Sequence, residues 1–191
     1  HSVNVMVGHE YYKTTTKFLG AIAQGGFSPS IPEIDAFAKI SDASSYKSGY
    51  NVEGYFGSAQ YNYDQKYFAS ASFRRDASSY FAKENRWGNF WSVGGAWLIS
   101  KENFMQSSAS WLNMLKLKFS VGQQGNDNIG AYAYTDLYDL VPTGSTSMGA
   151  TFKRMGNPDI TWETTTNYNL GVEFSLWEGR LSGNVDYYVK K

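Results

Sequence analysis

Apolar and polar side chains alternate at every second position over most of this chain. Between Tyr55 and Asp64, tyrosine, glycine and alanine occupy one set of alternate positions, and most of the other set is polar. Neighbouring side chains of a β-strand point to opposite faces of a sheet, so this period of two predicts strands with one apolar and one polar face. About seven such strands are predicted, within residues 2–13, 55–64, 67–74, 88–101, 115–121, 167–176 and 181–189.

One of these segments fits the pattern less well. The second face of residues 88–101 carries Phe90, Ser92, Gly94, Ala96 and Leu98, which are mostly small and only partly polar. Two explanations stay open. Either this face packs against something inside the fold, or the register of the strand differs from the one assigned.

The predicted connections alternate between compact and extended. In chain order they are long (14–51), tight (64–66), medium (76–87), fairly short (102–112), long (126–160) and tight (177–179). In an up-and-down sheet this alternation places the compact turns at one end and the longer loops at the other, as in outer-membrane barrels. A compact soluble domain rarely carries two structureless loops longer than about fifteen residues.

The composition excludes several classes of protein. The chain has no long, continuous apolar run, so a transmembrane helix is not expected. Aromatic residues make up 17% of the 191 residues, yet the mean hydropathy is -0.44. These values fit a soluble β-protein or a membrane barrel, whose alternating strands hide an apolar face from averaging. The net charge is zero and basic residues are not clustered, so no nucleic-acid partner is expected.

The tryptophans lie close to the ends of the predicted strands. All of Trp87, Trp91, Trp97, Trp111, Trp162 and Trp177 show this placement, and tyrosines flank the tight turn at 64–66. Indole and phenol rings combine an apolar body with one polar group, so they favour the boundary between hydrocarbon and water. Aromatic residues at strand ends can also close off the core of a sandwich. The residues expected at a membrane interface are Tyr63, Tyr67, Trp91, Trp97, Trp111 and Trp177.

The two longest connections have different characters. In the first, Ser30, Pro32 and early acidic residues within 30–40 predict a short helix. The second contains Tyr132 and Tyr134 and continues into a serine-rich stretch. Side chains of this kind suit adaptable polar contacts to a ligand or a partner, although a merely solvated loop explains them equally well.

Several stretches resemble the SusC/RagA family of TonB-linked outer-membrane transporters, which is typical of Bacteroidetes. They occur in the family's order across residues 52–191. The matching stretches are Tyr61–Tyr67, Ser72–Ser79, Arg86–Phe90, Gly95–Trp97, Trp111–Lys118, Gly122–Asn126, Asn157–Thr165 and Arg180–Tyr188. The chain departs from the family's pattern at Ser58, Ala77, Tyr80 and Trp91.

The resemblance implies an all-β fold, namely an antiparallel up-and-down transmembrane β-barrel segment with long extracellular loops. Residues 1–191 then form about seven strands of a larger barrel, and the plug domain is absent from this chain. Large barrels need a plug because their lumen is otherwise open. The resemblance further implies a place in the cell outer membrane, import of a glycan or peptide substrate, energy from the TonB complex through an N-terminal part, and a SusD-like surface lipoprotein as partner.

Polar side chains on the inner face are the candidates for contact with substrate or plug. Arg74 and Asp76 lie where a strand leaves the sheet, and a solvated ion pair is the simpler explanation for them. Together with the two tyrosines of the second long connection, the full set of candidates is Arg74, Asp76, Asn62, Asn167, Glu173, Tyr132 and Tyr134.

No catalytic or metal site is expected. His1 and His9 are the only histidines, and the chain has no cysteine to complete a metal site. The pattern Ser44-Ser45-Tyr46-Lys47 fits a short nucleophile motif, but no supporting motif accompanies it. We therefore expect no enzyme and no cofactor.

Three functions remain in competition on the sequence. The first is active import through an outer-membrane barrel. The second is a soluble secreted β-sandwich that binds carbohydrate, and the third is a small outer-membrane barrel without energised transport. The first two differ in what the rows of Leu115, Leu117 and Phe119 or Leu170 and Val172 should face: lipid in a barrel, and a second sheet in a sandwich.

Overall fold

The computed structural model describes all residues, 1–191, and the chain divides into two compact units. The first unit comprises residues 1–11 and 52–191, and the second comprises residues 12–51. The strands of the main sheet are β1 (Ser2–Gly26), β2 (Phe37–Tyr63), β3 (Tyr67–Ser78), β4 (Trp87–Leu98), β5 (Leu112–Asn126), β8 (Glu163–Leu176) and β9 (Leu181–Lys190). A second sheet contains β6 (Leu137–Pro142) and β7 (Met148–Arg154). Three short 3-10 helices complete the fold: η1 (Ile34–Ala36), η2 (Ile99–Lys101) and η3 (Asn103–Ser108).

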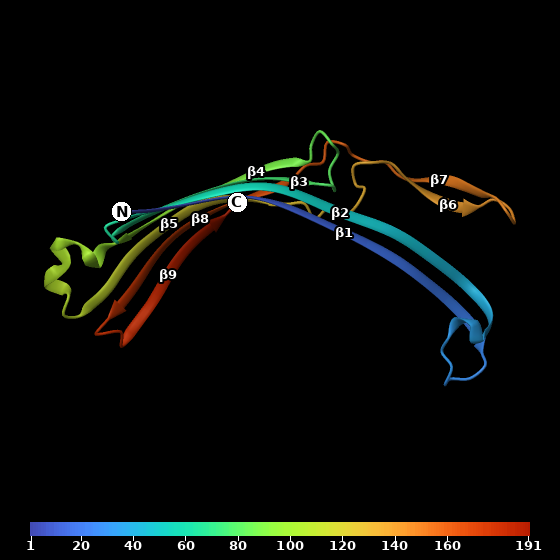
Figure 1. Ribbon diagram of the computed structural model, residues 1–191, viewed down its shortest axis with the longest axis horizontal. Coiled ribbons are helices and arrows are strands. Elements are labelled where there is room, and N and C mark those ends of the chain that lie inside the picture. Colours follow the sequence, from blue (N-terminus) through green and yellow to red (C-terminus); the bar gives the residue numbers. More distant parts are fainter. The chain divides into compact units, whose positions relative to one another are not determined.

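The main sheet has seven strands in the order β1-β2-β3-β4-β5-β8-β9, which confirms the predicted up-and-down arrangement (Figure 1). From β2 to β9, each strand of this sheet pairs antiparallel with the next. The β6–β7 hairpin is an excursion between β5 and β8, which pair directly with each other. No helix of the structure is long and apolar enough to cross a membrane.

The tight turns are built by backbone with positive φ. Asp64 and Gln65 have φ values of 53° and 54°, which are those of the two central residues of a type I′ turn. The Asn62 side-chain oxygen accepts a hydrogen bond from the Gln65 N–H at 2.9 Å. The second turn, after β8, uses Trp177 and Glu178 followed by Gly179, all with positive φ. The short turns at both positions are therefore as predicted.

The prediction of a structureless loop over 14–51 is wrong. These residues continue β1 and β2 as a long two-stranded ribbon, in which Phe18 stacks on Tyr46 and Tyr12 meets Tyr50 edge-on. The short helix predicted within 30–40 is present only as the three-residue 3-10 helix Ile34–Ala36, and the chain is a strand from Phe37. Both faces of an isolated ribbon are open to water, so its sequence carries no strong apolar alternation to reveal it.

The second long connection, 126–160, is likewise not structureless. It contains the β6–β7 hairpin, in which Tyr138 pairs with Phe152 and Asp139 bonds Lys153 at 2.7 Å. The medium and fairly short connections lie where they were predicted, and 102–112 includes η3.

The sheet is a single layer with almost no core. Only five apolar residues are buried, namely Ala77, Phe81, Ala82, Phe90 and Leu112. A soluble sandwich of this length would bury an entire face of each sheet. The structure therefore does not contain the two layers that the carbohydrate-binding sandwich requires.

Candidate functional site

One face of the main sheet is apolar and uncovered. The pairing registers align its side chains into rows that cross β2, β3, β4, β5, β8 and β9 in turn. One row is Tyr61, Ala69, Gly95, Phe119, Leu170 and Tyr187, and the next is Ala59, Ala71, Val93, Val121, Tyr168 and Val189. Phe119 is 55% exposed and Leu170 is 52% exposed, so these rows lack any packing partner within the chain.

Aromatic residues edge this face at the end that carries the tight turns. Tyr63, Tyr67 and Trp97 are paired across β2, β3 and β4, and their ring centroids are 6.0 and 6.4 Å apart. Trp111 precedes β5 and Trp177 follows β8, so both lie at this same end of the sheet. The backbone N–H of Trp177 donates a hydrogen bond to the carbonyl oxygen of Trp111 at 2.7 Å. We call these five residues the aromatic girdle. All five were expected at a membrane interface.

Trp91 occupies a different height on the same face. It lies in β4, pairs with Phe73 of β3 and is 41% exposed. Trp87 lies ten residues before Trp97, which corresponds to roughly 25 Å of membrane depth for a strand rising about 3.3 Å per residue at a tilt of about 40°. The Trp87 ring stacks on Tyr55 at 6.2 Å and lies under the Arg75 guanidinium at 5.0 Å. Trp87 therefore fits the opposite boundary of an apolar band about 25 Å tall better than Trp91 does.

A glutamate joins the girdle to the connection between β4 and β5. One Glu102 carboxylate oxygen accepts hydrogen bonds from the Tyr67 hydroxyl at 2.6 Å and from the Trp97 indole N–H at 3.0 Å. Lys66 lies 3.7 Å from the other oxygen. The Tyr67 hydrogen bond, then that of Trp97 and the charge of Lys66, hold the pKa of Glu102 below its usual value. Sequence reasoning missed this residue, because Glu102 carries no local motif.

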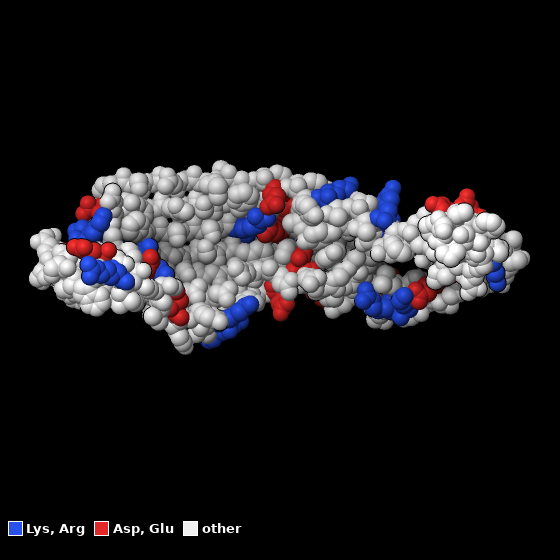
Figure 2. All heavy atoms as spheres, turned by 90° about the horizontal axis from the view of Figure 1, so that it is seen from below, with Lys and Arg blue, Asp and Glu red and all other residues white.

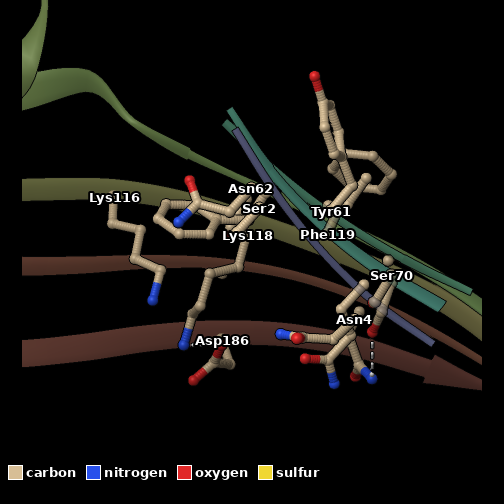
Figure 3. A pocket seen from close by; sticks show the side chains of 18 residues that line it. Ser2, Asn4, Tyr61, Asn62, Ser70, Lys116, Lys118, Phe119 and Asp186 are labelled. Carbon is tan, nitrogen blue, oxygen red and sulfur yellow. Dashed lines mark hydrogen bonds and ion pairs between the residues drawn. The ribbon is translucent and has the colours of Figure 1, made fainter. Parts of the chain in front are cut away.

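The opposite face of the sheet is polar and hollowed (Figure 3). A hollow of about 730 Å³ lies over β2, β3, β4, β5, β8 and β9, with small residues such as Gly94, Ala96 and Gly171 in its floor. Amide, hydroxyl and charged groups surround it, and the Lys118 side chain extends toward Asp186, 3.4 Å away. This surface can donate and accept many hydrogen bonds. The open question about β4 is answered in part here, since its small residues leave room for this hollow.

Arg74 lies at the centre of an ion network on the polar face. Its Nε is 2.7 Å from both Asp76 carboxylate oxygens, and its Nη2 donates to Glu10 at 2.9 Å. The guanidinium also lies over the Phe56 ring at 5.4 Å. Asp76 is buried and Arg74 is partly exposed. The network is thus more than a solvated ion pair, because the contact between Arg74 and Glu10 ties β3 to β1 across β2.

The other inner-face candidates have more ordinary partners. Asn62 supports the tight turn through its bond to the Gln65 N–H. Glu173 lies 3.6 Å from the Lys116 ammonium. Asn167 pairs with Gly122 on β5 in the polar rows. These three residues lie on one face, but the structure does not bring them together into a single cluster with Arg74.

The two tyrosine candidates lie away from the sheet, in the connection that precedes β6. Tyr132 has a φ of 61° and is 46% exposed, and its carbonyl oxygen accepts from Arg154 at 3.4 Å. Tyr134 is half-buried. Both lie apart from the inner-face candidates in the fold.

Trp162 lies next to the start of β8, as predicted, but it does not belong to the girdle. Its ring packs against Phe81 at 5.4 Å and against Phe90 at 5.1 Å. The Asn85 amide bonds the Pro158 carbonyl at 2.9 Å, and the Thr161 hydroxyl bonds the Asn85 carbonyl at 3.0 Å. This loop latch, made of residues 78–90 and 157–162, explains why Phe90 faces inward from β4: it packs against another part of the fold.

Charged side chains are sparse and mixed in sign on the face that Figure 2 shows. Small groups of basic and acidic residues lie side by side there and are separated by uncharged surface. No group of three or more histidine, cysteine or acidic residues suited to a metal ion occurs in the structure.

The comparisons with known proteins agree with this geometry. The family model described as TonB dependent receptor-like, beta-barrel matches residues 2–191. The TonB-dependent receptor P26 of Formosa agariphila is 32% identical over 200 residues, covering 100% of this chain and 20% of the relative. The TonB-dependent receptor SusC of Bacteroides thetaiotaomicron is 34% identical over 161 residues, covering 81% of this chain and 16% of SusC.

Solved structures show the same arrangement of strands. The structure of the RagAB peptide transporter matches with a TM-score of 0.89 and 31% identity, over 98% of this chain and 21% of that chain. The RagAB peptide importer in the open-open state matches with a TM-score of 0.86. This chain spans about a fifth of the length of the proteins that it matches.

Proposed function

This chain belongs to the TonB dependent receptor-like β-barrel family, and we propose on that premise that it forms part of the wall of an outer-membrane importer of glycans or peptides. The family is one of receptors and transporters of the outer membrane, and its barrel fold is the fold seen here. Residues 1–191 form part of the barrel domain in this proposal. The plug belongs to another part of the whole protein.

The uncovered apolar rows carry the proposal. Apolar side chains on six neighbouring strands are paired in register and have no second layer over them. Exposed in water, a surface of this extent would drive association or aggregation. Against acyl chains it needs no cover, and the polar face opposite it suits a water-filled or plugged lumen.

The same observation weighs against the two competing functions. A carbohydrate-binding sandwich needs its apolar rows packed against a second sheet, and these rows are open. A small barrel without energised transport needs a sheet that closes on its own, whereas β1 and β9 are the two edges of this one. A sheet edge does not persist in lipid, so both edges pair with further strands of the whole protein in this proposal.

The partners follow from the relatives and are part of the proposal. The RagAB structures are those of a peptide importer, and SusC is a TonB-dependent receptor. By analogy, the whole protein takes its energy from the TonB complex and works with a SusD-like surface lipoprotein. It imports its substrate without catalysing a reaction on it.

The polar face supplies the proposed contacts. Asn167, Glu173 and the Arg74–Asp76 pair present hydrogen-bonding groups toward the lumen, where a plug or a passing substrate meets them. Tyr132 and Tyr134 lie in the extended connection at the other end of the strands from the tight turns, and we assign them to ligand or lipoprotein contact.

Uptake by cells tests the proposal. The whole gene would be deleted from its host, and uptake of labelled oligosaccharides and of labelled oligopeptides would be measured before and after complementation. We expect uptake of one of the two classes to fall on deletion, to return on complementation, and to be lost again in a host without TonB. Unchanged uptake of both classes, or uptake that does not depend on TonB, would contradict the proposed function.

A further inference from the structure

The connection between β4 and β5 carries an exposed phenylalanine at the turn end of the sheet. Residues 99–111 contain η2 and η3, and the Phe104 side chain is 66% exposed. An isolated apolar side chain on a protein surface is ordinary and needs no partner. The residues around Phe104 distinguish it from such an isolated side chain.

Both ends of this connection are fixed to the aromatic girdle. At its beginning, the Glu102 carboxylate binds the polar ends of Tyr67 and Trp97. At its end, the carbonyl oxygen of Trp111 accepts a hydrogen bond from the Trp177 N–H. The residues in between are therefore held at the height of the girdle, where hydrocarbon gives way to water.

The charges at this place cancel one another. The Lys66 ammonium lies 3.7 Å from both Asp64 and Glu102, and the Lys101 ammonium donates to the Gln65 side-chain oxygen at 2.9 Å. Two basic and two acidic side chains thus share this place, and their formal charges sum to zero, so neither sign is left in excess for an anionic or cationic headgroup. An apolar contact explains the site better than an electrostatic one.

We infer that residues 99–111 form an interfacial foot, in which the Phe104 ring inserts into the phospholipid leaflet at the turn end of the barrel. The inference rests on the proposed function, because it requires the apolar face of the sheet to contact lipid. An apolar ring beside an interfacial backbone gains free energy by leaving water for the acyl boundary. The girdle next to residues 99–111 places Phe104 at the membrane boundary, and Glu102 attaches these residues to Tyr67 and Trp97.

Spin labelling of the whole protein tests the foot. This chain has no cysteine, so a nitroxide can be placed at Phe104→Cys once any cysteine elsewhere in the protein is replaced by serine. In phosphatidylcholine nanodiscs, we expect the label at position 104 to collide more with oxygen than with a water-soluble nickel chelate. Gln106→Cys is the matched control, because it is exposed, polar and about 120° away around a 3-10 helix. The control label should favour the nickel chelate.

A third label separates this inference from the proposed function. Phe119→Cys lies on the apolar face of β5 and reports whether the sheet contacts lipid. Oxygen preference at 119 together with nickel preference at 104 would overturn the foot alone. Nickel preference at both positions would overturn the proposed function and the foot with it.

Two further measurements sharpen the result. Addition of anionic lipid to the nanodiscs should leave the accessibility at 104 unchanged, and a strong increase in oxygen preference would contradict an apolar mode of contact. Glu102→Ala should loosen the attachment and reduce the oxygen preference at 104 without changing that at 119. An undiminished preference would show that Glu102 does not hold the foot.

Discussion

The indole N–H of Trp162 donates a hydrogen bond to the backbone carbonyl of Arg86 at 2.8 Å and so joins two loops that are 76 residues apart in the chain. The ring of the same tryptophan fills the space between Phe81, which is fully buried, and Phe90. The loop after β3 and the segment before β8 therefore form one packed body. The β6–β7 hairpin lies in the connection between β5 and β8, and this packing holds the later end of that connection in place.

Replacement of Trp162 should release the loop latch. We expect Trp162→Ala to destabilise the latch locally by about 3–5 kcal/mol, because it removes a large ring from a packed cluster. Trp162→Phe keeps a ring and loses only the N–H donor, so it should cost about 1 kcal/mol. Hydrogen exchange of residues 78–86 measures both. Equal protection in the alanine variant and the parent would show that the latch does not depend on this ring.

Lysine on the apolar face should be costly at mid-height. Val93 lies on β4, six residues after Trp87 and four before Trp97, and Val121 is its partner on β5, so both are near the middle of the band. We expect Val93→Lys or Val121→Lys to cost about 2–4 kcal/mol in unfolding from a bilayer.

Ser72→Lys is the control for that charge scan. Ser72 lies on the polar face, where its hydroxyl is 2.7 Å from that of Ser92. A lysine there reaches water, so its cost should stay near that of an ordinary surface substitution, about 0.5 kcal/mol. Equal tolerance of lysine at Val93 and Ser72 would contradict the assignment of the two faces.

A side chain at position 54 should break the Arg74 network. A Cβ on Gly54 would collide with a carboxylate oxygen of Asp76 and lie 2.8 Å from Arg74 Nη2. We expect Gly54→Ala to cost about 1–3 kcal/mol, as overpacking does. Gly57→Ala is the matched control on the same strand, because its Cβ would meet nothing closer than 3.6 Å. Denaturant unfolding compares the two variants, and equal stability would refute the close fit.

Acid should weaken the attachment of residues 99–111. The hydrogen bond from Tyr67, with that from Trp97 and the nearby Lys66, lowers the pKa of Glu102 from its ordinary value of 4.5. Because the folded-state pKa is the lower one, the stabilisation is complete above the ordinary pKa and is lost as the pH falls through the folded value. A spin label at Gln106→Cys should become more mobile as the pH falls below the ordinary pKa of Glu102. Glu102→Gln removes the titrating group, and an identical profile in that variant would exclude Glu102 as its cause.

The sequence by itself determined the strands and their two faces. Where one face meets an apolar environment and the other a polar one, every second residue is selected for its surroundings, and the pattern appears in the chain. For this reason β3, β5, β8 and β9 were predicted close to their observed places. The same reasoning placed Tyr67, Trp97 and Trp177 near the ends of strands, where each of them lies.

Only the tertiary structure decided which distant residues meet. Nothing near Arg74 in the sequence identifies Glu10 as a partner, and nothing near Trp162 identifies Phe81, because these pairs depend on strand register and loop closure. The ribbon of residues 12–51 was not predicted, for a different physical reason. Both of its faces meet water, so its sequence does not alternate between apolar and polar side chains. The local sequence therefore reflects the environment of each strand. The contacts between distant residues, which hold the loops in place, form only when the sheet is assembled.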